Sequence, residues 1–241
     1  MLDWLRRRPD QPVLVPVGER RLPLVIRRLP QARRMTLRLA PDGSEVRISM
    51  PRWGREAEAI AFVRSREDWL ARQLVRMPVR QPLTAGATLP YRGTPHRIEH
   101  SAGLPRRPVA DGGILRLGGT EEGLETRIER WLRAESRVLF AADLADYAAR
   151  AELPPPALAL SNAQARWGSC SAKGLVRLNW RLVMAPDAVR RSVVAHEVAH
   201  LVHFDHSPRF YAMLGQLYEG DIEAANRWLK AQGRGLYGYF G

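Results

Sequence analysis

The chain has 241 residues, a formal net charge of +13 and one cysteine, Cys170. The length is enough to bury a core in one large domain or two small ones, while the single cysteine excludes an intrachain disulfide and the lack of a long apolar run excludes a membrane-spanning helix. The charge comes almost wholly from arginine and favours contact with polyanions, including nucleic acid, but we favour the simpler explanation of an arginine-rich proteome because the arginines are scattered along the sequence.

The N-terminal third is predicted to be rich in β-strands. Residues 1–18 lack the continuous apolar stretch of a signal peptide, which predicts a soluble cytoplasmic protein. Apolar residues alternate with others over 22–26, and again on both sides of a Pro-Asp-Gly turn. This alternation predicts a hairpin of residues 35–39 and 46–50. From about 55 to 76 the apolar spacing becomes that of a helix.

The middle of the chain changes from turns to a long helix. Six prolines and several glycines over 78–113 predict short strands and turns. A helix follows, with Thr120 as its N-cap and its end near Arg150, before three consecutive prolines. Its predicted buried stripe consists of Leu124, Ile128, Leu132, Val138, Leu139 and Ala142. We therefore divide the chain into a β-rich region with one helix, 1–113, and a second region, 114–241.

The second region continues with two short strands and several helices. The strands are expected near 163–170 and 175–183, joined by a turn at 171–174. A helix then begins at Pro186-Asp187, and Asp187 is suited to cap it. Further helical segments are expected over 207–218 and 221–232.

The helix that begins at Pro186-Asp187 carries the clearest chemical signal. Residues 196–206 read HEVAHLVHFDH and hold four of the six histidines. On a helix, His196 and His200 project from the same face and can share one metal ion. Glu197 between them is placed to take a proton from a metal-bound water, as in HExxH zinc peptidases. The pattern predicts a zinc-dependent hydrolase.

A catalytic zinc site usually takes a third protein ligand and leaves one position for water. His203 lies about 10.5 Å along the helix from His196, too far for zinc–nitrogen bonds of about 2.1 Å, so we expect a partly buried helix histidine there. His206 can serve if the helix ends near His203. In another group of HExxH enzymes the third ligand is a glutamate on a later helix, which makes Glu219 or Glu223 the alternative. We favour His206.

Other residues near the motif have two explanations each. The strand at 167–170 could pair with an extended peptide substrate, or Trp167 could pack against the motif helix while Gly168 permits its close approach. Cys170 is not expected to act as a nucleophile, because the neighbouring histidines would hold metal. Tyr211 could stabilise an oxyanion, although an aromatic residue packed within a helix is the commoner case.

Several further motifs surround HExxH in a fixed order. They are Arg166-Trp167-Gly168-Ser169-Cys170-Ser171, Leu178-Asn179-Trp180-Arg181-Leu182, Ala185-Pro186, the HEVAHL of 196–201, His206-Ser207 with Phe210, and near the N-terminus Arg33-Arg34-Met35-Thr36-Leu37 and Pro41-Asp42-Gly43. Over most of its length the chain thereby resembles the YgjP-like metal-dependent hydrolases, bacterial metallopeptidases related to the SprT-like proteases. Metzincins share the histidine spacing, but they carry glycine where His203 stands, and Met213 comes too soon for their methionine turn.

The resemblance implies an α+β, zincin-like fold with a β-rich N-terminal region and a helical C-terminal zinc-binding region. It also implies one Zn²⁺ ion held by His196, His200 and His206. The leading hypothesis is a zinc metallopeptidase that acts on polypeptides, with Glu197 as general base and no membrane association. One alternative is an SprT-like protease recruited to nucleic acid to digest DNA-bound proteins. Another is a non-catalytic, metal-stabilised binding module, which would not need the base Glu197.

Overall fold

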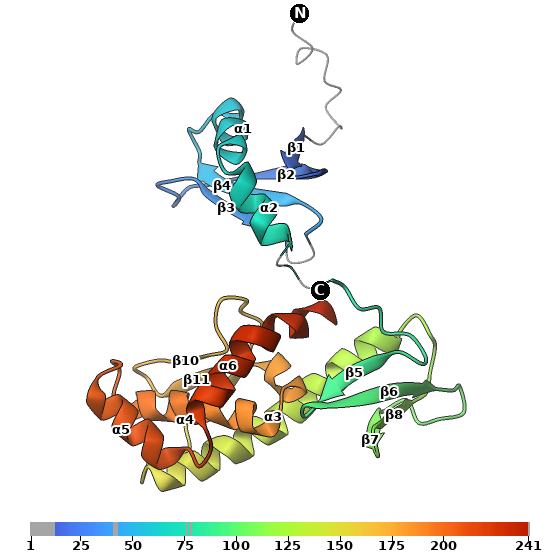
Figure 1. Ribbon diagram of the computed structural model, residues 1–241, viewed down its shortest axis with the longest axis vertical. Helices are drawn as coiled ribbons and strands as arrows, with labels where there is room; N and C mark the ends of the chain where they lie inside the picture. Colours follow the sequence, from blue (N-terminus) through green and yellow to red (C-terminus); the bar gives the residue numbers. More distant parts are fainter. Residues whose placement is uncertain (1–12, 41–42, 76, 78, 241) are drawn as a thin grey trace, which may run out of the picture. The chain divides into compact units, whose positions relative to one another are not determined.

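The computed structural model describes residues 13–40, 43–75, 77 and 79–240, and its chain forms two compact units, one within 1–78 and the other over 79–240 (Figure 1). Both units combine helices with a sheet, so the predicted α+β class is confirmed. The organisation into regions 1–113 and 114–241 stays a prediction. Within the described residues, no helix is both long and apolar enough to cross a membrane.

The described residues of the first unit form a four-stranded sheet with two helices. Its elements are β1 (Val13–Val17), β2 (Arg20–Leu29), β3 (Thr36–Leu39), β4 (Val46–Pro51), α1 (Glu56–Arg64) and α2 (Glu67–Val75). The strand order is β1-β2-β4-β3, in which β2 and β4 are parallel and the other pairs antiparallel. The predicted hairpin is confirmed, because Leu37 lies opposite Ile48 and Leu39 opposite Val46. Pro41 and Asp42 of its turn lie outside the described residues.

The two helices of the first unit cover one face of its sheet. Alternate strand residues point to this face and form a core with the helices, namely Val15, Val17, Leu22, Leu24, Val46, Ile48 and Met50 with Ala59, Val63 and Leu70. The prediction of one helix over 55–76 is wrong, since the helix breaks at Ser65. The Ser65 hydroxyl donates to the carbonyl of Phe62 (2.8 Å), and Glu67 and Asp68 then favour a new helix N-terminus.

The second unit contains two sheets and the longer helices. Its strands are β5 (Thr88–Tyr91), β6 (Thr94–His100), β7 (Val109–Asp111), β8 (Ile114–Leu117), β9 (Ala157–Ser161), β10 (Gly168–Cys170) and β11 (Leu175–Asn179). Its helices are α3 (Leu124–Arg150), α4 (Asp187–Val202), α5 (Pro208–Leu217) and α6 (Ile222–Gln232), with two 3₁₀ helices, η2 (Trp180–Met184) and η3 (Gly233–Gly238). The sheet orders are β5-β6-β8-β7 and β10-β11-β9. The short strands and turns predicted for 78–113 are confirmed.

Helix α3 differs in detail from its prediction. It begins at Leu124, and Thr120 does not cap it; the Thr120 carbonyl instead accepts a hydrogen bond from the Arg127 guanidinium. Val138 is 67% exposed, and Ala142 is exposed as well. The buried face advances in steps of three and four residues through Ile128, Leu132, Ser136, Phe140, Leu144 and Tyr147. Val138 lies two residues from Ser136 and from Phe140, which places it on the opposite face of the helix.

The segment between α3 and α4 forms the three-stranded sheet. The predicted strand 163–170 is limited to β10, and the predicted strand 175–183 ends at Asn179, whose side chain accepts a hydrogen bond from the backbone N–H of Arg181 and caps η2. The turn at 171–174 is confirmed by a 2.9 Å bond from the N–H of Gly174 to the carbonyl of Ser171. β9 was not predicted; it directly follows the prolines and pairs in parallel with β11.

Helix α3 connects the two hydrophobic clusters of the second unit. Its first half packs with the β5–β8 sheet and η2, around Ile128, Leu132 and Trp180. Its second half packs with β11, α4 and α5, around Phe140, Leu144 and Phe210. Helix α4 is therefore held between α3, the three-stranded sheet and α5, and this packing positions the residues of the HExxH motif.

Candidate metal centre

The motif helix α4 begins at Asp187 and ends at Val202, so its predicted end near His203 is confirmed. The prediction that Asp187 caps it is wrong. Pro186 occupies the N-cap position without a side-chain cap, and Asp187 lies in the first turn. The Asp187 carboxylate accepts hydrogen bonds from Arg92 and Arg190, and these bonds lower its pKa against the opposing effect of partial burial.

The first half of α4 is anchored by paired arginines. Arg190 Nε donates to Asp143 Oδ2 of α3 at 2.7 Å, and the two side chains are only 4% and 6% exposed. Arg191 donates to Asp143, to Asp146 and to Glu219. Because a buried ion pair needs additional hydrogen bonds to offset its desolvation, this dense network fixes the position of α4 against α3.

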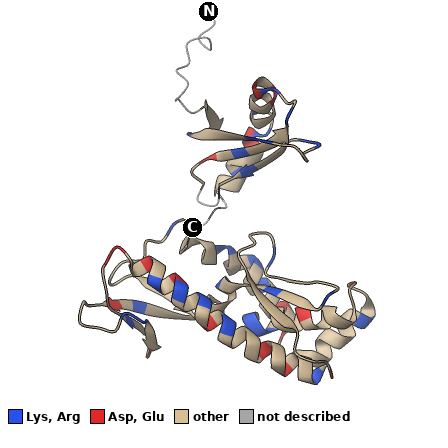
Figure 2. Cartoon of the chain, turned by 180° about the vertical axis from the view of Figure 1, so that it is seen from behind, with Lys and Arg blue, Asp and Glu red and all other residues tan. Residues whose placement is uncertain are grey.

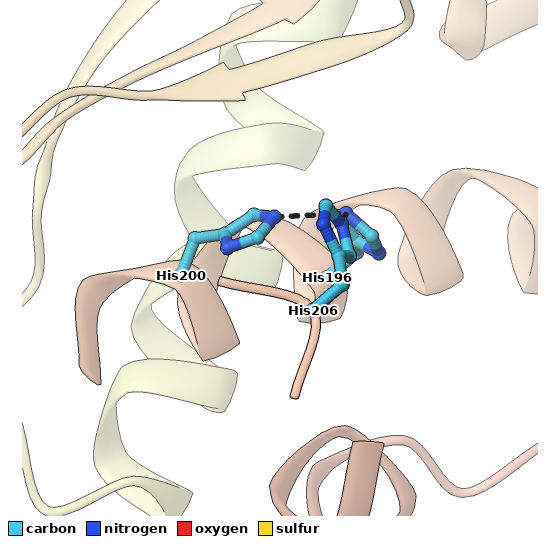
Figure 3. A group of neighbouring side chains, drawn as sticks. All are labelled: His196, His200 and His206. Carbon is cyan, nitrogen blue, oxygen red and sulfur yellow. Dashed lines mark hydrogen bonds between the residues drawn. The ribbon is translucent and has the colours of Figure 1, made fainter. Parts of the chain in front are cut away.

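The second half of α4 and the turn that follows it bring three imidazole rings together (Figure 3). The Nε2 atom of His196 lies 3.1 Å from Nε2 of His200 and 3.4 Å from Nε2 of His206. Four ligands arranged tetrahedrally about zinc, at bonds of about 2.05 Å, lie about 3.3 Å apart. Among the described residues these three histidines form a group whose ligand atoms lie within 4.8 Å of one another, so they could hold a metal ion.

A backbone carbonyl orients one of the rings. Nδ1 of His200 lies 2.9 Å from the carbonyl oxygen of His203, which can only accept a hydrogen bond. Nδ1 must therefore carry the proton, which leaves the Nε2 lone pair of His200 available to a metal. The His203 ring is not in the three-histidine group and lines a different cavity, of about 430 Å³, with Arg150 and Arg209.

The ring of Phe210 packs against the three imidazole rings. Phe210 was not predicted as a site residue. It is fully buried, and its ring centroid lies 4.9 Å from that of His196, 4.5 Å from that of His200 and 4.8 Å from that of His206. The signal was available in the spacing, because Phe210 follows His206 by four residues and starts the buried face of α5. An aromatic ring in contact with all three imidazoles restricts their rotation and preorganises the group.

The charge state of His196 suits metal binding. Burial, together with the charges of His200 and His206, lowers the pKa of His196 to about 4. At neutral pH its imidazole is therefore neutral and can donate a nitrogen lone pair without losing a proton.

Glu197 is a buried carboxylate beside the three histidines. It is 5% exposed, and its Oε2 atom has no hydrogen-bond partner among the described residues. Burial raises the pKa of Glu197 to about 7, although the nearby Arg166 acts to lower it. A buried carboxyl oxygen without a partner is costly, and a site that supplies a ligand or a water explains its retention.

Gly168 of β10 makes room for this carboxylate. A Cβ atom at Gly168 would lie 2.7 Å from both Cγ and Cδ of Glu197, closer than any side chain allows. The prediction that Gly168 permits a close approach to the motif helix is confirmed. Trp167 is also partly buried and packs against the two core clusters of this unit.

Glu197, His196 and His206 line one cavity of about 360 Å³, together with Gly168, Tyr211 and Asn226. Tyr211 is 58% exposed and is thus not packed in the core, contrary to the commoner case for a helix aromatic. Cys170 lies outside this lining, and burial with the charge of Glu197 raises the pKa of its thiol, which disfavours a thiolate.

The two glutamates considered as alternative metal ligands are not in the three-histidine group. The Glu219 carboxylate accepts hydrogen bonds from Tyr147, Arg150 and Arg191. Glu223 lies in the first turn of α6, 3.6 Å from Arg227, with its side chain 88% exposed. His206, in contrast, lies in the chain reversal between α4 and α5, where α5 starts with Pro208.

Comparison with known protein families matches residues 33–232 to the family described as YgjP-like, metallopeptidase domain. Searches of curated proteins and of solved structures each found no match. The family match covers most of the chain, including β3, β4 and the whole of the three-histidine group. On this match, the chain belongs to the YgjP-like metallopeptidase family.

Proposed function

We propose that the protein is a zinc-dependent peptidase with a zincin-like catalytic region, in which His196, His200 and His206 are the metal ligands. The observation that carries the proposal is the convergence of three imidazole nitrogens next to a buried carboxylate in one cavity. Three neutral nitrogen donors with one open position are the donor set of catalytic zinc sites. Bound zinc would supply Lewis acidity and lower the pKa of a water at the site.

Glu197 is the proposed general base. Its Oε2, which no described residue hydrogen-bonds, can accept a proton from the attacking water and then donate it to the amine that leaves the cleaved peptide bond. Burial keeps the carboxylate weakly solvated and raises its pKa, which favours return of the proton to the leaving amine. Gly168 maintains the carboxylate in place, because the strand backbone packs directly against it.

β10 is the proposed binding site for the substrate backbone. It is an edge strand of the β10-β11-β9 sheet, so its outer edge pairs with no described strand. It also contacts α4 next to Glu197. An extended polypeptide that pairs with this edge would present its carbonyl groups near the cavity, as in other cases of β-strand addition.

Metal analysis tests the ligand set. We expect about one zinc per chain in the wild type, loss of zinc in His206→Ala, and retention in Glu219→Ala and Glu223→Ala, each measured after dialysis against a weak chelator. Peptidase activity on an unstructured polypeptide should disappear together with the metal. Loss of zinc in a glutamate variant, with retention in His206→Ala, would overturn the assignment.

A further inference from the structure

The strand topology of the first unit collects arginines at one end of its sheet. β2 and β4 are parallel, so both strands end at the same edge, and β3 is antiparallel to β4, so it begins there. The residues at these three positions form a group that we name the arginine edge: Arg27 and Arg28 at the end of β2, Arg33 and Arg34 before β3, and Arg52 and Trp53 after β4. Figure 2 shows blue segments, which mark Lys and Arg, on the loops of this unit.

The five arginines of the arginine edge are exposed and form no ion pair with the described residues of the unit. By contrast, Arg47 on the same sheet pairs with Glu45 at 2.6 Å. Glu19 and Glu45 precede β2 and β4 and therefore lie at the opposite end of the sheet. Like charges held close together repel one another, and a bound polyanion relieves that repulsion.

The acidic residues that follow Arg52 in sequence belong to the start of a helix. Glu56 and Glu58 lie in the first turn of α1, where carboxylates interact favourably with the helix dipole. Glu58 accepts a hydrogen bond from the backbone N–H of Arg55 at 3.0 Å and is used as a helix cap.

Trp53 adds an exposed aromatic platform to the arginines. Its side chain is 78% exposed, and the turn that carries it is closed by a bond from the N–H of Gly54 to the carbonyl of Pro51 (3.1 Å). Guanidinium groups bind phosphate oxygens in a bidentate manner, and an exposed indole stacks on unpaired bases. Binding to a membrane surface would need several exposed apolar side chains, whereas Trp53 is the only large one in the arginine edge.

We infer that the arginine edge binds single-stranded nucleic acid, with the arginines on the phosphates and Trp53 stacked on a base. This inference uses only the first unit and does not depend on the proposed peptidase activity. The Glu197→Gln variant is therefore expected to bind nucleic acid as the wild type does, which separates a failure of either proposal from the other.

The test is fluorescence anisotropy of the full chain with a labelled oligodeoxythymidine of about 20 nucleotides at several salt concentrations. If each arginine contacts one phosphate, the affinity falls with a log–log salt slope of about −3.5, and Arg33→Gln/Arg34→Gln reduces that slope by about 1.4. Trp53→Ala should weaken binding about 5- to 150-fold and leave the slope unchanged, with partial rescue in Trp53→Phe. The charge-matched control is Arg64→Gln/Arg72→Gln on the helices, which should bind like the wild type.

Three results would overturn the inference. One is the absence of binding to the oligonucleotide at low salt. Another is equal loss of affinity in the helix control and in Arg33→Gln/Arg34→Gln, which would indicate a diffuse charge effect. The last is co-sedimentation of the chain with phosphatidylserine vesicles that requires Trp53, without binding to the oligonucleotide. Circular dichroism and thermal unfolding verify that each variant is folded, as expected for substitutions of exposed side chains.

Discussion

The two halves of α4 differ in whether their polar side chains have hydrogen-bond or ion-pair partners. In the first half, the guanidinium groups of Arg190 and Arg191 have carboxylate partners on α3 and at Glu219. In the second half, Glu197 has a carboxyl oxygen without a hydrogen-bond partner in the part of the chain that the structure describes, and burial lowers the pKa of His196 so that its ring is neutral. The first half thus connects helices to one another, whereas the second half holds groups that are available to a ligand.

The two halves of α4 are therefore expected to contribute to different properties, the first to stability and the second to the proposed activity. Buried polar groups that all have hydrogen-bond partners make their region rigid. Buried polar groups without partners lower the stability of the fold, and a bound ligand can recover that loss. Substitutions in the first half should therefore lower the free energy of unfolding, and substitutions in the second half should lower activity with little loss of stability. The following predictions examine this distinction, beginning with the largest expected effect.

Glu197→Gln should reduce peptidase activity by about 10²- to 10⁴-fold, because the amide cannot accept the proton. Its zinc content should equal that of the wild type, and its thermal midpoint should be unchanged or higher, since a buried carboxylate is removed. Activity assays, metal analysis and thermal unfolding measure the three quantities. Full activity in this variant would refute the role of Glu197 as general base.

Asp143→Ala should lower the free energy of unfolding by about 3–5 kcal/mol, because it removes the buried carboxylate that pairs with Arg190 and leaves this buried guanidinium with Asp187 as its remaining carboxylate partner. The control is Glu129→Ala, which removes the partly exposed partner of Arg133 and should cost less than about 1 kcal/mol. Urea denaturation monitored by circular dichroism gives both values. Similar costs in the two variants would mean that the network of α4 does not anchor the helix.

Phe210→Leu should weaken zinc binding about 10-fold, because the three imidazole rings lose the surface that orients them. The cost in stability should be about 1.5 kcal/mol or less, since leucine retains most of the buried volume. Phe240→Leu, at another buried phenylalanine of the same unit, is the control with a comparable stability cost. Competition with a chelator measures the zinc affinity, which Phe240→Leu should leave unchanged.

Low pH should weaken the ion-pair network of Arg191, because Glu219 becomes protonated. Partial burial acts to raise its pKa, but hydrogen bonds from the backbone, Tyr147 and Arg191 lower it to about 2, against the usual 4.5 of a glutamate. The stabilisation is thus complete above pH 4.5 and is lost as the pH falls toward 2. Its size is about 1 kcal/mol or less, because the side chain is half exposed. Thermal unfolding between pH 6 and 2.5 should show a smaller acid loss in Glu219→Gln than in the wild type.

The sequence was most informative where local spacing determines geometry. The interval between His196 and His200 predicts one face of a helix, and the length limit on a helix excluded His203 and directed attention to His206. The same reasoning could not detect the role of the His203 backbone, because a carbonyl carries no side-chain signal. The contact of Phe210 with three imidazole rings also required the fold of the chain between α4 and α5.

Errors arose where tertiary contacts overrode local preference. Val138 is apolar but lies outside the buried face of α3, and Asp187 pairs with Arg92, a residue far away in sequence, in place of capping α4. The arginine edge could not be predicted from the sequence either. Arg27, Arg33 and Arg52 are scattered in sequence, and only the parallel pairing of β2 with β4 brings them to one end of a sheet.

The contact between Gly168 and Glu197 limits how the cavity could be redesigned. Any larger residue at position 168 would require the carboxylate to move, so an engineer who seeks a new substrate preference cannot begin there. Tyr211 and Asn226 also line this cavity, and they belong to α5 and α6, not to the strand that packs against the carboxylate. Libraries that vary positions 211 and 226 would therefore reshape the cavity without acting on the contact between Gly168 and Glu197.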